Sequence, residues 1–373
     1  MGLGTSSIWS WLGYSGARVS WIEELHKDSN KKLGVAPIPC INYRLTTPST
    51  QLNCALGGGL PGGRTIEVIG DAAAGKTSSV ASWCAIVQRM GGFVWWADAE
   101  TKFDMNLGAL TGLNYDSAAW RYDNPDNLEQ YQTQLEANIR LAVGGQNKVK
   151  DPPPAMFVLD SLAALGIKAI SEKKVDKQAL RPMSAAQQWT HFFQREVPKM
   201  LMGSNIYLVF INHIRDNPDT LGYGQKPEFK SPGGKMVKFM ETIRIFVKCQ
   251  KFAKSSQKFA EIWAMEDKDS EYGYMVQYYV EKNSAGPPWR KAEIPFFFHR
   301  GFDDYLGSLH YLTDKGIIAW RGGHYWLDDL QFRSYPEILK KLCEDPTFGP
   351  LLQKYAALTF QTRNTYTADD FLN

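Results

Sequence analysis

The sequence predicts an α/β protein built on a doubly wound, mostly parallel β-sheet. Five short apolar runs follow one another along the chain, at residues 65–69, 93–97, 156–160, 206–211 and 242–247. Each run is continuous rather than alternating, which is typical of strands that are buried on both faces of a sheet. Stretches with helical periodicity separate the runs, and this alternation favours parallel strands covered by helices. Ligands of such sheets bind beyond the C-terminal ends of the strands.

The composition is that of a globular protein with little net charge. The chain has 373 residues, long for one domain, of which 44% are hydrophobic and 22% charged, with a net charge of +3. A charge this small does not indicate nucleic acid or membrane, so any basic surface must be local. Neither a membrane-spanning run nor a signal peptide is visible, so no membrane association and a cytoplasmic location are expected. The cysteines form no CxxC pair, which argues against a disulfide framework or a zinc site.

Two helices are expected between the apolar runs. After the first run, apolar residues recur with helical spacing at Val80, Trp83, Cys84 and Val87. Gly91–Gly92 should end this helix. A second helix should begin at Ser184, which forms a capping-box pattern with Gln187, and Pro198 should kink or end it. One face of the second helix carries Trp189, Phe192, Phe193 and Val197.

The chain is expected to have three parts. Residues 1–45 are expected to form an N-terminal arm ahead of the core, with a short amphipathic helix within residues 16–33. Residues 46–298 form the α/β core. From residue 299 to residue 373 the pattern changes to short helices and a hairpin around Gly322–Gly323, which predicts a small α+β domain.

The strongest motif is a phosphate-binding loop between the first apolar run and the first helix. It satisfies GxxxxGK[ST] in full with Gly70, Asp71, Ala72, Ala73, Ala74, Gly75, Lys76 and Thr77, and Ser78 continues it. Its small residues let backbone N–H groups and the helix dipole face the phosphates of ATP. Lys76 is expected to reach the β- and γ-phosphates, and Thr77 to bind Mg²⁺. A glycine-rich turn with a solvent-exposed lysine is the alternative, and the strand–helix context argues against it.

Carboxylates follow two of the apolar runs at the same expected edge of the sheet. Asp160 ends the run 156–160, where it is expected to hold Mg²⁺ through water; a helix cap is the alternative. Glu100 follows the run 93–97, where it could position and deprotonate the attacking water. Asp98 is its rival for this role. Spacing alone does not separate the two.

These residues carry a resemblance to the RecA family of recombinases that covers nearly the whole chain, most strongly residues 46–295. The resemblance identifies Glu100 with the catalytic glutamate of the family, and Asp104 with an adenine contact. It implies that His213 senses the γ-phosphate, and that Lys282 reaches the ATP of a neighbouring subunit. It also implies that residues 21–34 pack on the next protomer, so that residues 1–45 would be an oligomerisation arm. The segments that resemble the family are TTPSTQLNCALGGGLPGGRTIEVIGDAAAGKT, WWADAETKFD, MFVLDSLAAL, LVFINHIR, SPGGKMVKFMETIRI, EKNSAGPPW and WIEELHKDSNKKLG.

Three positions depart from the family's pattern. His213 replaces the usual glutamine, and Ser284 stands where the family has a second lysine. Leu107 occupies the position of an adenine-stacking aromatic residue. These changes bear on nucleotide preference and on the strength of ATP coupling, and they suit a distant member, such as one from a bacteriophage.

Two polar segments beyond the strand ends are locally basic. Residues 168–182 carry five cations against two acids, and residues 215–238 hold five cations and four glycines. Such segments can neutralise DNA phosphates whatever the sequence. On composition alone they would be solvated loops, but the resemblance favours two DNA-binding loops, at about 168–182 and 215–232. The residues expected to contact DNA are Arg181, Arg215, Gly233, Gly234 and Lys238.

The predicted function is that of a DNA-dependent ATPase. With ATP and Mg²⁺ it would form a helical filament on single-stranded DNA and exchange strands with double-stranded DNA in recombination and repair. Single-strand-binding and loader proteins are expected partners. A ring-forming RecA-fold helicase or motor is one alternative, although no loading domain is visible. A non-hydrolysing filament or accessory factor is the other, which Ser284 and His213 leave open.

Overall fold

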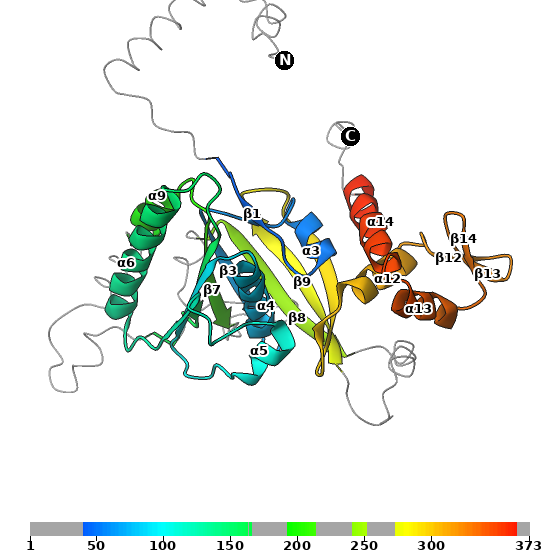
Figure 1. Cartoon of the computed structure of the whole chain (residues 1–373), viewed down its shortest axis with the longest axis horizontal. Coiled ribbons are helices and arrows are strands. Elements are labelled where there is room, and N and C mark those ends of the chain that lie inside the picture. The colour runs from blue at the N-terminus through cyan, green and yellow to red at the C-terminus, as the bar shows by residue number, and fades with distance from the viewer. Residues whose placement is uncertain (1–39, 163, 166–191, 214–240, 252–272, 364–373) are drawn as a thin grey trace, which may run out of the picture. The chain divides into compact units, whose positions relative to one another are not determined.

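The computed structural model describes residues 40–162, 164–165, 192–213, 241–251 and 273–363 (Figure 1). The predicted oligomerisation helix, both predicted DNA-binding loops and the start of the second predicted helix lie outside these ranges. In the part that the structure describes, no helix is both long and apolar enough to span a membrane.

A single large sheet forms the centre of the described fold. Its strand order is β11-β10-β9-β8-β3-β7-β6-β4-β5. The six strands from β8 to β5 run parallel, whereas β9, β10 and β11 extend the sheet as antiparallel strands. The bounds are β3 Arg64–Gly70, β4 Phe93–Asp98, β5 Trp120–Asp123, β6 Ala155–Asp160, β7 Ile206–His213, β8 Ile243–Lys251, β9 Gly273–Asn283, β10 Arg290–Phe297 and β11 Gly301–Phe302.

This topology confirms the predicted fold class and the five predicted strands. The apolar runs correspond to β3, β4, β6, β7 and β8. No apolar run indicated β5, because its residues WRYD are only partly buried at the edge of the sheet. An edge strand needs no continuous apolar run, since only one side of it pairs with a neighbour.

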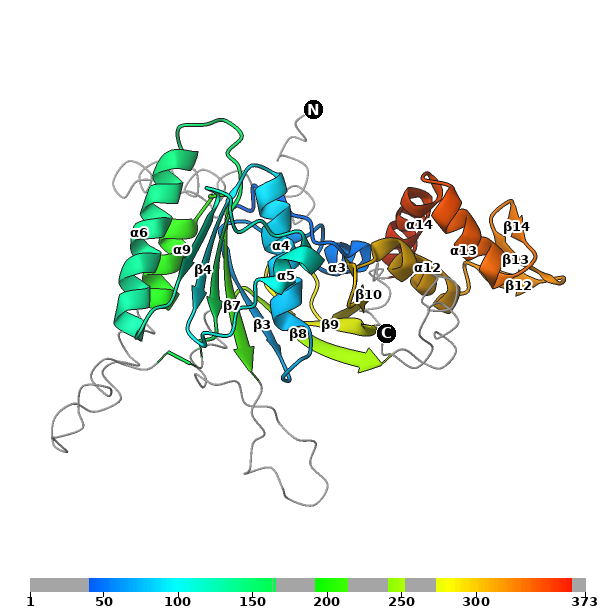
Figure 2. The same cartoon turned by 60° about the horizontal axis from the view of Figure 1, so that its bottom comes forward.

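Helices cover both faces of the parallel strands (Figure 2). Helices α4 (Lys76–Arg89) and α5 (Asn106–Thr111) lie on one face, and α6 (Leu128–Gln146) and α9 (Val197–Leu201) lie on the other. Side chains on alternate positions of β4 therefore enter different buried clusters. Val94 and Trp96 belong to the cluster under α4, and Trp95 and Ala97 to the cluster under α6. This is why the strands are continuously apolar.

The two predicted helices are present where the structure describes them. The apolar positions of α4 are fully buried, Met90 caps the helix, and Gly91 follows with a φ of 74°. Of the second helix, the π-helical turn Phe192–Glu196 and α9 are described, and Phe192, Phe193 and Val197 are buried as predicted. Pro198 lies where the π-helical turn passes into α9, which ends at Leu201. A proline there leaves one helical hydrogen bond unmade.

The remaining elements flank the antiparallel end of the sheet. A short lead-in comprises β1 (Arg44–Leu45), α3 (Thr50–Ala55) and β2 (Leu60–Pro61). The C-terminal elements are α12 (Asp304–Asp314), β12 (Ala319–Arg321), β13 (His324–Leu327), β14 (Leu330–Phe332), α13 (Tyr335–Glu344) and α14 (Phe348–Arg363). The predicted hairpin is confirmed: β12 and β13 pair around Gly322 and Gly323, whose φ angles of 57° and 81° suit a two-residue turn.

The C-terminal elements share a core with the sheet. One cluster of buried side chains includes Ile294 and Phe296 of β10 together with Leu309 of α12 and Phe348 of α14. Asp304 also joins three helices, since it accepts from the Thr50 backbone N–H at 2.8 Å and from Gln353 Nε2 at 2.7 Å. The domain boundary predicted at residue 299 stays a prediction.

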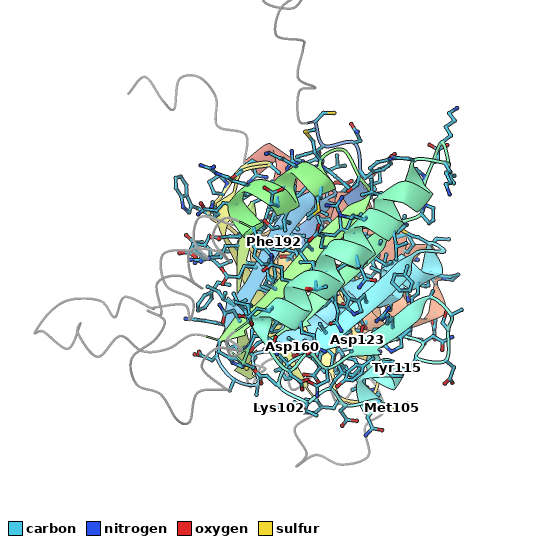
Figure 3. The ribbon with its side chains drawn as sticks, turned by 90° about the vertical axis from the view of Figure 1, so that its left-hand side faces the viewer. Lys102, Met105, Tyr115, Asp123, Asp160 and Phe192 are labelled. Atoms are coloured by element: carbon cyan, nitrogen blue, oxygen red, sulfur yellow. The ribbon has the colours of Figure 1, made fainter. Side chains whose placement is uncertain are left out.

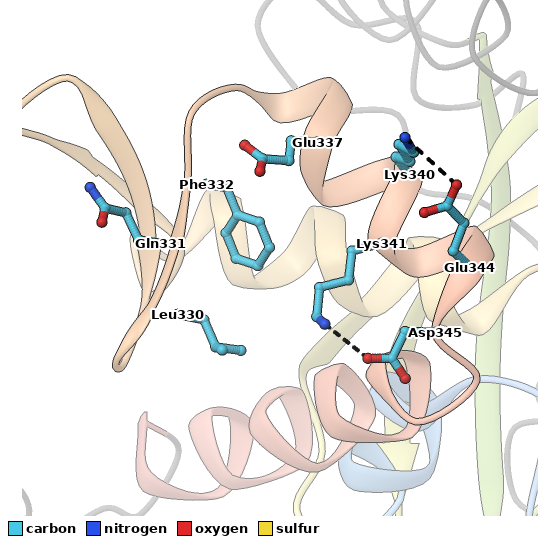
Figure 4. A pocket seen from close by; sticks show the side chains of 8 residues that line it. All are labelled: Leu330, Gln331, Phe332, Glu337, Lys340, Lys341, Glu344 and Asp345. Atoms are coloured by element: carbon cyan, nitrogen blue, oxygen red, sulfur yellow. Dashed lines mark hydrogen bonds and ion pairs between the residues drawn. The ribbon is translucent and has the colours of Figure 1, made fainter.

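A hollow of about 530 Å³ lies between β14 and α13 (Figure 4). Two lysines line it, and each is paired with an acid four residues further on. Lys340 Nζ lies 3.8 Å from Glu344 Oε1, and Lys341 Nζ lies 2.9 Å from Asp345 Oδ2. Glu337 adds a third acid to the two lysines and their partners, so the lining has no excess of positive charge that would favour an anionic ligand.

Candidate nucleotide site

The phosphate-binding loop joins β3 to α4 at the C-terminal edge of the parallel strands. Gly70 is held so close to β8 that a Cβ atom there would lie 2.2 Å from the carbonyl oxygen of Val247. Gly75 has a φ of 89° and Ala73 a φ of 57°, so the chain turns sharply twice before α4 begins. A close approach and a left-handed turn of this kind explain why glycines are needed at positions 70 and 75.

Lys76 lies inside this loop. Its ammonium group donates to the carbonyl oxygens of Gly70 at 2.9 Å and Asp71 at 2.6 Å. Burial lowers the pKa of Lys76, although three nearby carboxylates oppose this effect. A buried cation at a helix N-terminus, surrounded by small residues, is suited to bind the phosphates of a nucleotide.

Thr77 and Asp160 meet beside the loop. Thr77 Oγ1 donates to Asp160 Oδ2 at 3.2 Å. Burial, helped by the charge of Glu100, raises the pKa of Asp160 to about 7. A hydroxyl and a carboxylate are hard oxygen ligands, and Mg²⁺ at nucleotide sites takes one or two such groups besides phosphates and water. The two residues therefore fit the predicted magnesium ion.

Glu100 lies at the same edge and receives three donors. Ser161 Oγ donates to Glu100 Oε1, Lys102 Nζ lies 2.9 Å from Oε2, and His213 Nε2 lies 3.2 Å from Oε1. Partial burial alone would raise the pKa of Glu100, but the hydrogen bonds from Ser161 and Lys102 outweigh it and the pKa is lowered. In this arrangement Glu100 is ionised and a weak base.

His213 connects the loop to Glu100. Its Nδ1 lies 3.5 Å from Lys76 Nζ, and its Nε2 faces the carboxylate. Since a lysine ammonium can only donate, Nδ1 accepts and the N–H is on Nε2. Burial and the neighbouring charge of Lys76 lower the pKa of His213, which favours this neutral form. The His213 ring thus bridges the Lys76 ammonium group and the Glu100 carboxylate.

Asp98 has a different role from Glu100. It is 1% exposed and accepts from four consecutive backbone N–H groups, those of residues 100–103, at 2.8–3.0 Å. The Tyr122 hydroxyl adds a fifth donor at 3.0 Å. A carboxylate has about four lone-pair sites, so Asp98 has none left for a substrate water. Asp98 shapes the loop that carries Glu100.

The predicted adenine side of the site is also at this edge. Asp104 precedes α5 and accepts from the backbone N–H of Asn106 at 2.9 Å. Leu107 is partly buried and packs against the core, and as an aliphatic side chain it offers no aromatic ring for stacking. Lys102 and Met105 lie at the same end of the sheet as Asp160 (Figure 3), and their side chains are exposed.

Lys282 is not brought to the phosphate-binding loop of its own chain. In the sheet register, Lys282 of β9 pairs with Arg244 of β8, and Arg244 pairs with Glu67 of β3. The loop begins only after Gly70, three residues further along β3, which is about 10 Å at the usual rise of a strand. Lys282 therefore lies toward the N-terminal ends of the parallel strands.

A buried network of charges next to Lys282 escaped the sequence prediction. Arg244 Nε lies 2.7 Å from Glu67 Oε2, and its other nitrogens lie 3.3 Å from Glu241 Oε1 and 3.5 Å from Glu281 Oε2. Lys282 Nζ is 3.8 Å from Glu241 Oε1. The sequence held one signal of this network: an acid in the middle of TIEVI and a base in the middle of TIRIFV. Opposite charges in two buried strands indicate a pair.

The network also reaches the nucleotide edge. Asn212 Nδ2 donates to Glu67 Oε1 at 3.0 Å, and Asn212 directly precedes His213. Glu241 follows shortly after the second basic segment, which ends at residue 238.

None of the predicted DNA contacts lies within the described residues. These contacts are Arg181, Arg215, Gly233, Gly234 and Lys238.

Comparisons with known proteins agree with this architecture. The family model described as the RecA N-terminal domain matches residues 19–303. Protein RecA of Thermus thermophilus is 29% identical over 336 residues, covering 86% of this chain and 89% of the relative. Protein RecA of Clostridioides difficile is 29% identical over 329 residues, covering 87% and 84%. For protein RecA of Thermus aquaticus the values are 30% over 308 residues, and 81% of each chain. Because the family model spans well over half of the sequence, the chain belongs to the RecA family.

Proposed function

We propose that this protein is an ATP-dependent recombinase that assembles on single-stranded DNA and exchanges it with a strand of duplex DNA. The observation that carries the proposal is the arrangement of Lys76, His213 and Glu100 around one phosphate-binding loop. An ATPase needs a cation that binds the phosphates and a carboxylate that positions the attacking water. Lys76 and Glu100 supply these groups, and His213 lies between them.

When bound, ATP and Mg²⁺ would supply the reactive phosphoryl group and the charge that neutralises it. Lys76 would exchange its contacts with loop carbonyls for phosphate oxygens, and Thr77 and Asp160 would hold the ion. The N–H of His213 would turn to the γ-phosphate. Glu100 would then lose a donor, become more basic and accept a proton from the attacking water.

Assembly into a helical filament is supported by the position of Lys282. A residue that lies away from its own loop can act on the loop of the next copy. Contacts between opposite edges of identical chains are heterologous, and such contacts build helical filaments unless they close into a ring. The ATP would then lie between subunits, with Lys282 as the contribution of the neighbour.

Coupling to DNA is supported by where the two basic segments leave the sheet. Strands β6 and β7 pair in parallel, and the segments follow them after residues 165 and 213. Both therefore leave at the edge that holds Glu100 and His213. Nucleotide contacts at this edge would bias both segments between a state that binds DNA and one that releases it. The site of action would be the cytoplasm of a cell, or of its host, with single-strand-binding and loader proteins as partners.

The Lys76→Ala variant tests the proposal. It removes the buried cation, so ATP-dependent filaments on single-stranded DNA should be absent by negative-stain microscopy, and DNA-stimulated ATP hydrolysis should fall by roughly 10²-fold or more. Lys148→Ala is the matched control, because Lys148 is exposed in the segment that leads to the N-terminal end of β6, at the opposite edge of the sheet from the loop. Filaments of normal length and number with Lys76→Ala would contradict the proposal.

A non-hydrolysing filament is the second candidate, and the donors around Glu100 favour it. A carboxylate with a lowered pKa is a poor base, and Ser284 removes one cation that the family usually offers. Measuring ATP hydrolysis and filament formation in the same preparation separates the two: filaments without turnover would support this candidate. Rings in place of helices would support a helicase-type motor.

A further inference from the structure

The last residue of β7 carries the ring that lies between the phosphate-binding loop and Glu100. On one side of β7, His213 pairs with Gly70 of β3. On the other side, β6 ends at Asp160, which pairs with Ile211. His213 therefore lies beyond the last residue pair of β6 and β7. Within the described residues, strand pairing holds its main chain from one side only.

The side chain of Asn212 adds a hydrogen bond at this point. Its Oδ1 accepts from the backbone N–H of His213 at 3.0 Å, and its Nδ2 donates to Glu67 Oε1 at 3.0 Å. Asn212 is completely buried. An amide group has an acceptor on one side and a donor on the other, so these two contacts fix its orientation. The amide of Asn212 thus links the main chain of His213 to the Glu67 carboxylate.

A buried cation holds the Glu67 carboxylate in turn. Glu67 Oε2 lies 2.7 Å from Arg244 Nε, and neither side chain is more than 5% exposed. Glu67 pairs in register with Arg244 on β8 and with Phe210 on β7, two residues before Asn212. Because alternate residues of a strand point to the same face, the three polar side chains share one face of the sheet. A displaced Asn212 would leave a buried charge with one partner fewer, which is costly.

The contacts of the His213 ring depend on where its main chain lies. Nε2 is 3.2 Å from Glu100 Oε1, and Nδ1 is 3.5 Å from Lys76 Nζ. The second distance is already at the limit of a hydrogen bond, so a small shift of the ring away from the loop would break it. Misplacing a reacting group by about 1 Å can lower a rate by about 10²-fold.

We infer that Asn212 is a positioning residue of the nucleotide site: it fixes the main chain of His213, and the buried pair of Glu67 and Arg244 fixes Asn212. Since Asn212 is buried, it acts on the nucleotide through His213 and not by contact. The inference rests on the proposed function, because the position of the ring affects turnover only if His213 meets the bound nucleotide.

The variants Asn212→Ala and Asn205→Ala form a matched pair. Asn205 is also buried and directly precedes the other end of β7, where it donates to the Pro152 carbonyl oxygen and accepts from the Tyr207 hydroxyl, both at 2.8 Å. Each variant loses two buried hydrogen bonds, so both should have a lower thermal midpoint. Well below these midpoints, only Asn212→Ala should lower the kcat of DNA-stimulated ATP hydrolysis, by roughly tenfold or more. The KM for ATP should change by less than about threefold, because Lys76 keeps its place in the loop.

A second readout does not depend on turnover. NMR spectra of protein with isotope-labelled histidine report the tautomer of each of its six histidines, and His213→Gln identifies the signal of His213. In the nucleotide-free wild type, the proton should be on Nε2, since Lys76 faces Nδ1. Asn212→Ala should give a mixture of tautomers, whereas Asn205→Ala should give the wild-type signal.

A hydrogen-bond swap tests the same contact without leaving a cavity. Asn212→Asp keeps an acceptor for the His213 N–H but sets a second carboxyl group against Glu67, so kcat should fall. Adding Glu67→Gln supplies a donor to that carboxyl group and keeps an oxygen toward Arg244. The kcat of the double variant should therefore return to within about threefold of the wild type.

Three results would overturn the inference: wild-type turnover and tautomer in Asn212→Ala, an equal loss of kcat in Asn205→Ala, or a swap that restores no activity. Wild-type protein that does not hydrolyse ATP would instead overturn the proposed function. The histidine spectra would still test the position of the ring in that case, so the two failures are distinguishable.

Discussion

Three carboxylates near one edge of the sheet have different hydrogen-bond partners and different roles. Asp98 is saturated with donors from its own loop, Glu100 is paired with side chains from other elements, and Asp160 faces a hydroxyl. Burial of Asp160 raises its pKa, and the donors on Glu100 lower its pKa. Residue type alone therefore says little about role, and the number and origin of the donors say more.

Substitutions at Asp98 and Glu100 should have opposite effects on stability and activity. Asp98→Asn places an amide group against backbone N–H donors, and we expect a loss of about 2–4 kcal/mol in the free energy of unfolding. Glu100→Gln keeps the shape and should leave stability within about 1 kcal/mol, while ATP turnover falls by roughly 10²-fold or more. Urea unfolding of both variants measures the change in the free energy of unfolding, and an ATPase assay measures the change in ATP turnover. Equal stability of the two variants would contradict the assignment of Asp98 to the loop.

Glu241 should make stability depend on pH. Burial raises its pKa from the ordinary range to about 7. A carboxyl whose folded pKa is raised stabilises the fold fully below its unfolded pKa, and this contribution is lost as the pH rises toward 7. Between about pH 5 and about pH 8 the wild type should therefore lose more stability than Glu241→Gln, by on the order of 2 kcal/mol. Chemical unfolding of both proteins at the two pH values measures this change in the free energy of unfolding. Parallel pH profiles of the two proteins would show that Glu241 does not titrate in this range.

At the scale of elements, the antiparallel extension of the sheet is joined to the parallel core by ion pairs of the buried Arg244, whose partner on β9, Glu281, is 47% exposed. Arg244 on β8 lies between Glu67 on β3 and Glu281 on β9, and Asn212 on β7 completes the contacts of Glu67. Four strands thus share one polar network inside a mostly apolar sheet. Such networks stabilise little when complete, but an incomplete one is costly because a buried charge remains unpaired.

Removing Arg244 alone should lower the free energy of unfolding more than replacing Glu67 and Arg244 together. Arg244→Ala leaves Glu67 buried without its cation, and we expect a loss of about 3–5 kcal/mol. Replacing Glu67 and Arg244 together by leucine should recover at least half of that loss, since no lone charge remains between them. Urea unfolding of the single and double variants measures the difference. A double variant less stable than Arg244→Ala would show that the pair itself stabilises the sheet.

At the scale of the whole molecule, the elements after residue 299 are held to the sheet by shared burial and by Asp304. Its two oxygens contact α3 through both the backbone and the hydroxyl of Thr50, and α14 through Gln353. Gln51 adds bonds from α3 to the carbonyl oxygens of Glu293 and Gly307. The contacts join segments that are far apart in sequence.

Residues 41–373 should therefore unfold in a single cooperative step. A chain shortened to end at residue 298 would expose the apolar side of β10, remove the Asp304 partner of Thr50 and remove the Gly307 partner of Gln51. We therefore expect it to aggregate or to unfold at least about 10 °C below the full chain, as a loss of several kcal/mol implies. Differential scanning calorimetry of both proteins provides the measurement. Two well-separated transitions of the full chain would favour an independent C-terminal domain.

Much of the fold was predictable because burial on both faces of a sheet requires continuous apolar runs in the sequence. Strands buried on both faces must be apolar throughout, and β3, β4, β6, β7 and β8 were visible for this reason. The edge strand β5 was missed because it is only partly buried, and β9 was missed because buried and partly buried residues alternate along its middle. The GxxxxGK[ST] loop was visible because its backbone geometry demands glycine at fixed positions.

The sequence by itself determined the α/β class, the phosphate-binding loop and the set of polar residues at the strand ends, because periodicity and loop chemistry are local. Only the tertiary structure decided that Glu100 meets His213 and that Lys282 lies away from its own loop. These facts depend on which distant segments pair in the sheet. Register is a property of the whole fold, and spacing along one chain does not contain it.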